Sequence, residues 1–184
     1  MDALEAYLVE LSANRLAGAV PETSGYGPLA TLLNEVGRHL KPTVRCVINP
    51  ANRGAGIPDG GFFVASQFEK GAADPLPGQL PARGALEVKP VGDDVHAVAG
   101  GEQVRRYLEK YRQVLVTTYR EFVLVGHGAE GEPRLLESYA LSETELGFWS
   151  LAASPRKAAT QHGERLGEFL KRCPASCPPA ARSK

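Results

Sequence analysis

The sequence predicts an α/β fold in which a central mixed β-sheet is flanked by helices. Apolar residues at helical spacing open and close the chain, and short β-branched or aromatic runs lie between them in two groups separated by a helical segment. The chain of 184 residues is 43% hydrophobic and 23% charged, which is the composition of one globular domain. At this length a core is available without disulfides or metal ions.

Two helices are expected at the beginning. Leucines recur at helical spacing within residues 2–17 and again within about 29–40, and Pro42 ends the second helix. Between them, "VPETSGYGP" (20–28) is a break rich in proline and glycine.

Three strands are expected next, at 43–48, 61–66 and 84–90, because short β-branched or aromatic runs are bounded there by turn residues. A Gly/Pro-rich loop, 49–60, joins the first two strands. The loop at 67–83 is long and polar, and such loops are often functional or mobile.

The second half returns to a helix and then to strands. After a turn at 92–94, a helix is expected at about 101–112, followed by hydrophobic strands at 114–118, 121–126 and 134–141.

Two helices near 142–151 and 155–172 then complete a single predicted domain, residues 1–172. The remaining residues, 173–184, have no apolar periodicity. We expect them to form a flexible tail that marks the boundary to further domains.

Charge and cysteine content narrow the classes of protein. Lys+Arg and Asp+Glu number 21 each, which argues against a DNA-binding surface along the whole chain but leaves room for a local basic channel. No apolar run is long enough for a membrane span and the N-terminus lacks a signal pattern, so a cytoplasmic location is expected. Cys173 and Cys177 are interpreted as free thiols in the tail rather than as half of a metal site.

The strand "GALEVKP" (84–90) carries charges inside an apolar run. Because side chains alternate between the faces of a strand, Glu87 and Lys89 point to the same side. Two interpretations are open: an edge strand with a surface ion pair, or a strand whose charged face lines a site. Asp59, at the start of the preceding strand, favours a site, because a shared end of the sheet would bring the three residues together.

Two carboxylates placed close together repel one another unless one is protonated or a cation lies between them. Mg²⁺ suits such a place because it binds one or two carboxylates and keeps several waters. We therefore expect Asp59, Glu87 and the backbone carbonyl of Val88 to bind Mg²⁺, with Mn²⁺ as a substitute. Lys89 is expected to polarise the attacking water and to offset charge on a phosphate, as in metal-assisted phosphodiester hydrolysis.

A third motif lies in the next helix. Gln103 and Tyr107 are four residues apart and therefore lie on one face of that helix. Gln103 is expected to bond DNA or a metal-bound water, and Tyr107 a backbone phosphate. The alternative for Tyr107 is core packing, because it also belongs to the apolar stripe of Val104, Leu108 and Tyr111.

Taken together, Pro58-Asp59, Glu87-Val88-Lys89 and Gln103-x3-Tyr107 resemble the PD-(D/E)xK nuclease superfamily, in its RecB-like branch. "PETSGY", "RCVINPANRGAGIPDGGFF" and "GALEVKP" further resemble the Mrr-like N-terminal nuclease domain of type ISP restriction–modification enzymes, over most of residues 20–170. That resemblance implies a restriction-endonuclease-like core. It also implies an acid at the first core helix, for which Glu22 is preferred over Glu35.

The resemblance implies an Mg²⁺-dependent endodeoxyribonuclease domain that nicks double-stranded DNA with little sequence specificity of its own. Its implied partners are a fused helicase-like ATPase, a methyltransferase and a target-recognition domain. The alternatives are a catalytically decayed module that binds DNA or a partner, and a repair exonuclease or Holliday-junction resolvase of the same superfamily. An RNA substrate is not excluded by the residues alone.

Overall fold

The computed structural model describes residues 1–48 and 58–175. Within them, a six-stranded mixed sheet has its strands side by side in chain order. Neighbouring strands run antiparallel, except that β3 and β4 are parallel. The strands are β1 (Val44–Ile48), β2 (Gly60–Val64), β3 (Ala85–Val88), β4 (Gln113–Thr117), β5 (Glu121–His127) and β6 (Pro133–Ala140). The predicted α/β class with a mixed sheet flanked by helices is confirmed.

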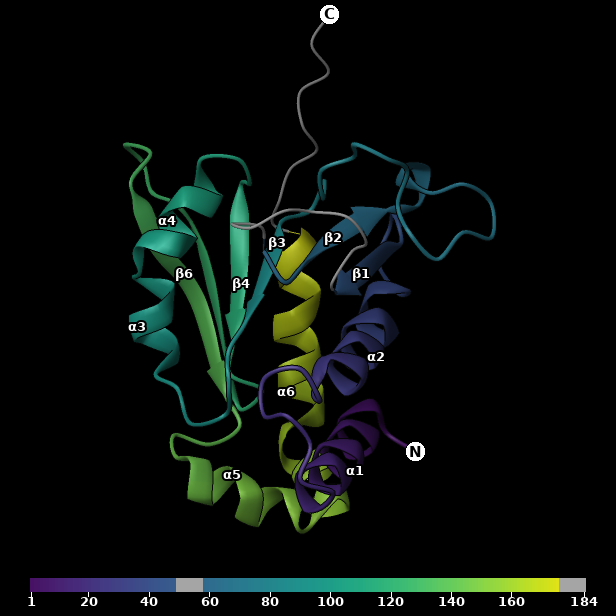
Figure 1. The fold of residues 1–184 in the computed structure, drawn as a ribbon, viewed down its shortest axis with the longest axis vertical. Coiled ribbons are helices and arrows are strands. Elements are labelled where there is room, and N and C mark those ends of the chain that lie inside the picture. Colours follow the sequence, from purple (N-terminus) through teal and green to yellow (C-terminus); the bar gives the residue numbers. More distant parts are fainter. Residues whose placement is uncertain (49–57, 176–184) are drawn as a thin grey trace, which may run out of the picture.

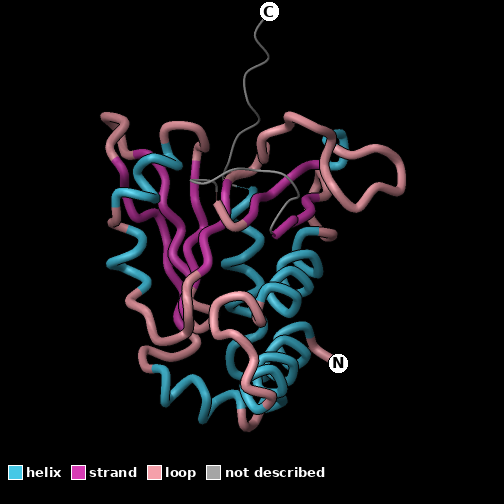
Figure 2. Tube along the Cα trace, viewed as in Figure 1, coloured by secondary structure: helices cyan, strands magenta, loops and turns pink. Residues whose placement is uncertain are grey.

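Helices cover both faces of the sheet (Figures 1 and 2). Two short helices lie on one face, α3 (Val95–Ala99) and α4 (Glu102–Leu108). The longer helices pack on the other face or below it; these are α1 (Ala3–Leu16), α2 (Tyr26–Gly37), α5 (Glu145–Ala152) and α6 (Pro155–Ala175). A short 3₁₀ turn, η1 (Ala65–Gln67), follows β2.

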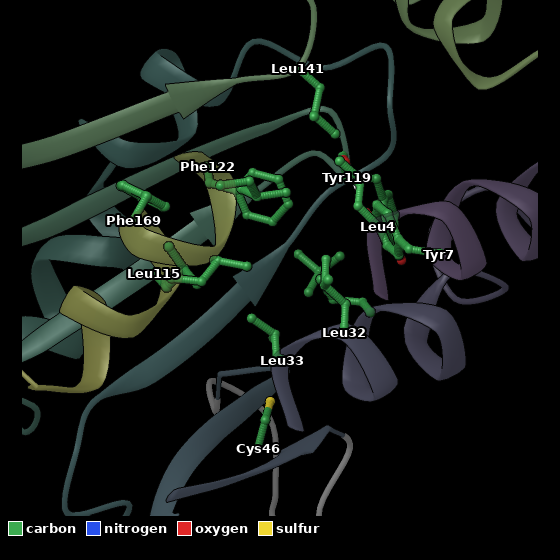
Figure 3. Close-up of a cluster of buried hydrophobic side chains, with 14 of the residues drawn as sticks. Leu4, Tyr7, Leu32, Leu33, Cys46, Leu115, Tyr119, Phe122, Leu141 and Phe169 are labelled. Atoms are coloured by element: carbon green, nitrogen blue, oxygen red, sulfur yellow. Dashed lines mark hydrogen bonds between the residues drawn. The ribbon is translucent and has the colours of Figure 1, made fainter. Parts of the chain in front are cut away.

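Alternation along the strands divides the buried side chains into two cores. Leu86 and Val88 of β3 belong to the larger core, with α1, α2, α5 and α6; part of that cluster is drawn in Figure 3. Ala85, the neighbour of Leu86, belongs to the smaller core under α3 and α4. Since side chains two residues apart share a face, Glu87 lies on the side of α3 and α4.

The strand that contains "ALEV" is central. β3 pairs with β2 on one side and with β4 on the other. The interpretation as an open edge strand is therefore wrong. Because parallel strands need a crossover connection, the chain leaves β3, forms α3 and α4 on one face, and returns as β4.

Most predicted boundaries shift by a few residues, and two differences are larger. The turn at 92–94 leads directly into α3, which the sequence reading missed; Asp94 caps this helix by accepting from the backbone amides of His96 and Ala97. At the other end, α6 continues to Ala175, and Cys173 is 2% exposed in the larger core. Its expected place in a flexible tail is therefore wrong.

Cys177 lies outside the described residues. Across the described ranges, 1–48 and 58–175, no helix combines the length and the apolar character needed to cross a membrane.

Candidate active site

Asp59 lies one residue before β2, beside the C-terminal end of β3. Gly60 pairs with Leu86, so the next step of the same register places Asp59 opposite Glu87. The Asp59 carboxylate reaches β3 directly, because its Oδ2 accepts a hydrogen bond of 2.7 Å from the backbone amide of Val88. The pairing of two neighbouring strands thus brings together two acids that are 28 positions apart in the chain.

Glu87 is almost fully buried, with 1% of its surface exposed. Its partner is Lys89, whose Nζ lies 2.7 Å from Oε1 of Glu87. Neither carboxylate oxygen of Glu87 accepts a well-oriented hydrogen bond from the described residues. A buried carboxylate without such bonds is costly, and native proteins keep few of them.

The charges of the cluster do not balance. Burial raises the pKa of Glu87, the ammonium of Lys89 opposes that rise, and the negative charge of Asp59 adds to it. Burial lowers the pKa of Lys89, but Glu87, Asp59 and Glu22 together outweigh it and raise this pKa overall. Among residues 1–48 and 58–175, three carboxylates surround one ammonium here and leave an excess of negative charge, which a cation would relieve.

Glu22 lies in the loop between α1 and α2, and its Oε1 is 3.8 Å from Nζ of Lys89. Glu35, the other candidate, pairs with Arg38 on the exposed surface of α2 at 2.7 Å. Of the two acids, Glu22 is the one that the fold brings to the cluster.

Gln103 and Tyr107 lie on one face of α4, and Nε2 of Gln103 donates to the Tyr107 hydroxyl at 2.7 Å. Tyr107 is 3% exposed and belongs to the smaller core, so the core-packing alternative describes its ring. Its hydroxyl lies near Glu87 and lowers the pKa of that carboxyl. Burial raises the pKa of Tyr107 to about 12, so the phenol keeps its proton at neutral pH. Tyr107 therefore meets the cluster at Glu87, and Gln103 is linked to it through Tyr107.

One further residue of the cluster was missed by the sequence reading. The hydroxyl of Tyr26, the first residue of α2, donates to Oδ1 of Asp59 at 3.0 Å. Tyr26 belongs to the quoted segment "PETSGY", but the predicted helix began three residues later, at Leu29. No local pattern links a tyrosine to a carboxylate 33 positions away, so only the three-dimensional arrangement reveals the contact.

The cluster suits a hard divalent cation. Asp59 and Glu87 offer two carboxylates. Two are enough for Mg²⁺, because this ion keeps several water molecules as its other ligands. Both buried oxygens of Glu87 lack well-oriented hydrogen bonds from the described residues, and its pKa is raised first by burial and then by the neighbouring Asp59. In the described part of the chain, no group of three or more His, Cys, Asp or Glu side chains is arranged to hold a metal. The carbonyl of Val88 as a third ligand remains a prediction.

Comparison with family models, with curated proteins and with solved structures found no match to this chain.

Proposed function

We propose that the chain is an Mg²⁺-dependent endonuclease domain that nicks double-stranded DNA by hydrolysing phosphodiester bonds. We further propose that its core is of the PD-(D/E)xK type, close to the Mrr-like nuclease domain of type ISP restriction–modification enzymes. The proposal rests on one observation above all. Asp59, Glu87 and Lys89, predicted from sequence as a catalytic set, converge at one end of the sheet around a buried, under-bonded carboxylate.

The topology supports the type of core. A helix, α2, leads into three antiparallel strands, and a helical crossover returns the chain to a fourth strand parallel to the third. The same order of a helix, three strands, a helix and a further strand is predicted from the sequence.

Each residue has a role that its surroundings permit. Asp59 and Glu87 would hold the cation, and Gln103 with Tyr107 would keep Glu87 in place. Lys89 is a quarter exposed, so its ammonium is accessible to a phosphate and to water while it remains paired with Glu87. When bound, a divalent cation supplies positive charge against the phosphate oxygens and acidifies water near them.

DNA is expected to bind weakly and without sequence specificity, because the chain has no net charge and phosphate contacts dominate non-specific affinity. A helicase-like ATPase, a methyltransferase and a target-recognition domain in the same polypeptide would then deliver the nuclease to its substrate.

Supercoiled plasmid tests the proposal. We expect the wild-type chain to produce nicked circles with Mg²⁺ or Mn²⁺ and none with EDTA. Asp59→Ala should lower the rate by about a thousandfold, because losing a Lewis acid costs several kcal/mol of transition-state stabilisation. The matched control is Asp94→Ala, which removes a helix cap on α3 and should cleave like wild type where it is folded.

Binding of plasmid without cleavage, together with metal titrations that are identical for wild type and Asp59→Ala, would indicate a non-catalytic module and overturn the proposal. Digestion from DNA ends, with intact circles left uncut, would indicate a repair exonuclease instead.

A further inference from the structure

The orientation of the Asp59 carboxylate is fixed from two sides. Oδ2 accepts from the backbone amide of Val88 at 2.7 Å, and Oδ1 accepts from the hydroxyl of Tyr26 at 3.0 Å. The first donor belongs to the sheet, so any residue at position 88 except proline would provide it. The second donor is a side chain and depends on the identity of residue 26.

Tyr26 is itself held at a defined position. It begins α2 directly after Gly25, and its backbone amide donates to the carbonyl of Thr23 at 3.1 Å. A side chain at position 25 would overlap the ring of Tyr119, which is 1% exposed. The turn before α2 therefore packs directly on the β4–β5 turn, which carries Tyr119.

Further hydrogen bonds tie the same segment to the core. The Tyr119 hydroxyl donates to the carbonyl of Glu22, and the Tyr7 hydroxyl donates to the carbonyl of Tyr119 at 2.8 Å. Asn14 adds a bond of 2.7 Å to the carbonyl of Ser24. Tyr7 and Tyr119 lie close together in Figure 3. Residues 22–26 are thus anchored independently of Asp59 and Lys89, the two residues of the cluster that they contact.

This anchored segment touches the cluster twice. Glu22 approaches Lys89, and Tyr26 bonds Asp59. An ordinary phenol keeps its proton at neutral pH, so the Tyr26 hydroxyl is available as a donor to Asp59.

We propose that Tyr26 is a positioning residue, which holds the Asp59 carboxylate in one orientation for a divalent cation. The inference rests on the proposed function and adds to it a residue that the three motifs do not contain. A carboxylate that is already oriented loses less conformational freedom on binding. Residues that orient metal ligands in this way typically affect metal affinity or activity by about 10–100-fold.

The test compares Tyr26→Phe, which keeps the ring and removes only the hydroxyl, with Tyr139→Phe. Tyr139 is a matched control because its half-buried hydroxyl also bonds one side chain, His162 at 2.9 Å, but on the sheet's far strand, β6. For both variants we would measure the melting temperature, the Mn²⁺ affinity by calorimetry, and kcat and KM for plasmid nicking.

We expect both variants to melt within a few degrees of each other, which shows that both are folded. Tyr26→Phe should bind Mn²⁺ about tenfold more weakly and nick with a lower kcat at saturating metal, with KM for DNA unchanged. Tyr139→Phe should match wild type in all three. A purely structural hydroxyl would change the melting temperature alone.

Two failures are distinguishable. Wild-type affinity and kcat in Tyr26→Phe would overturn the positioning role and leave the proposed function standing. A wild-type chain that binds no Mn²⁺ would overturn the proposed function and this inference together.

Discussion

Two ion pairs, one in the turn after β4 and one at the C-terminal end of β3, each contain a buried charge. They differ in how many hydrogen bonds the buried charge makes. Arg120, in the β4–β5 turn, is 6% exposed and pairs with Glu121. Its guanidinium also donates to four backbone carbonyls, those of Val91, Asp93, Ser142 and Glu143. This arrangement holds the turn, the segment after β3 and the segment after β6 together.

Glu87 is more deeply buried than Arg120 and yet has fewer partners. It faces Lys89 at 2.7 Å, but neither of its oxygens accepts a well-oriented hydrogen bond from the described residues. Its pKa is raised chiefly by burial, and Asp59 adds to the rise.

The difference separates a structural charge from a functional one. A buried charge with most of its donors used makes the fold more specific, and its loss leaves several orphaned groups. A buried charge without well-oriented hydrogen bonds costs stability, and such groups are concentrated at functional sites. On this basis we assign Arg120 to the scaffold and propose Glu87 for the site, and the substitutions of Arg120 and Glu87 below test that assignment.

The largest effect on stability is expected for Arg120→Met. The substitution leaves Glu121 without its partner and four carbonyls without donors, so the free energy of unfolding should fall by about 3–5 kcal/mol. Chemical denaturation measures this change. Arg45→Met is the control, because Arg45 bonds only two carbonyls of a loop and lies over the ring of Phe68, so its loss should cost less, about 1–2 kcal/mol. Equal losses in the two variants would contradict the scaffold role of Arg120.

Gly25→Ala should have the next largest effect. The added methyl group would overlap the buried ring of Tyr119, and overpacking of this kind typically costs about 1–3 kcal/mol. Gly27→Ala, two residues further and with open space around it, should instead stabilise α2 by about 0.5–1 kcal/mol. Thermal denaturation of the pair checks the sign at each position; stabilisation by both would mean that the segment before α2 is not anchored on Tyr119.

Glu87→Gln should change stability least. It removes a charge that is poorly compensated, so the free energy of unfolding should stay within about 1 kcal/mol of wild type or rise. Glu121→Gln is the matched control and should destabilise, because Arg120 then loses its carboxylate. If Glu87→Gln were the more damaging of the two, Glu87 would be a structural residue.

The smallest expected effect is the pH dependence of the difference in unfolding free energy between Glu87→Gln and wild type, which reports on Glu87 itself. Because the pKa of Glu87 is raised in the folded chain above the ordinary 4.5, the folded state holds this proton more tightly than the unfolded state does. The contribution to stability is present below pH 4.5 and is lost as pH rises through the raised pKa. The stability of Glu87→Gln relative to wild type should therefore grow over that window and then level off. A constant difference at every pH would contradict the raised pKa.

Much of the site could be predicted from sequence because it depends on strand alternation and register. Glu87 and Lys89 had to share a face, and a shared sheet end was enough to bring Asp59 near them. Gln103 and Tyr107 were placed on one helix face by their spacing. Their spacing did not decide whether that face points to the core or to the candidate site, because Tyr107 also belongs to an apolar stripe.

The parts that were missed depend on contacts distant in sequence or on very short elements. Tyr26 bonds Asp59 across 33 positions, and Arg120 gathers carbonyls from three separate segments. The helix α3 has five residues, too few to show a helical apolar period. Cys173 stands at the start of a proline-rich segment, which suggested a tail. In the structure Cys173 is buried in the larger core, and α6 continues beyond it to Ala175.

Calorimetric titration with Mn²⁺ tests the central claim most directly, because it measures whether the buried Glu87 carboxylate, which lacks well-oriented hydrogen bonds, binds a cation. The wild-type chain and Glu121→Gln, under conditions where both are folded, are expected to bind Mn²⁺, and Glu87→Gln is expected to lose this binding while its stability is kept. Undiminished Mn²⁺ affinity in Glu87→Gln, or no binding by the wild type, would contradict the account.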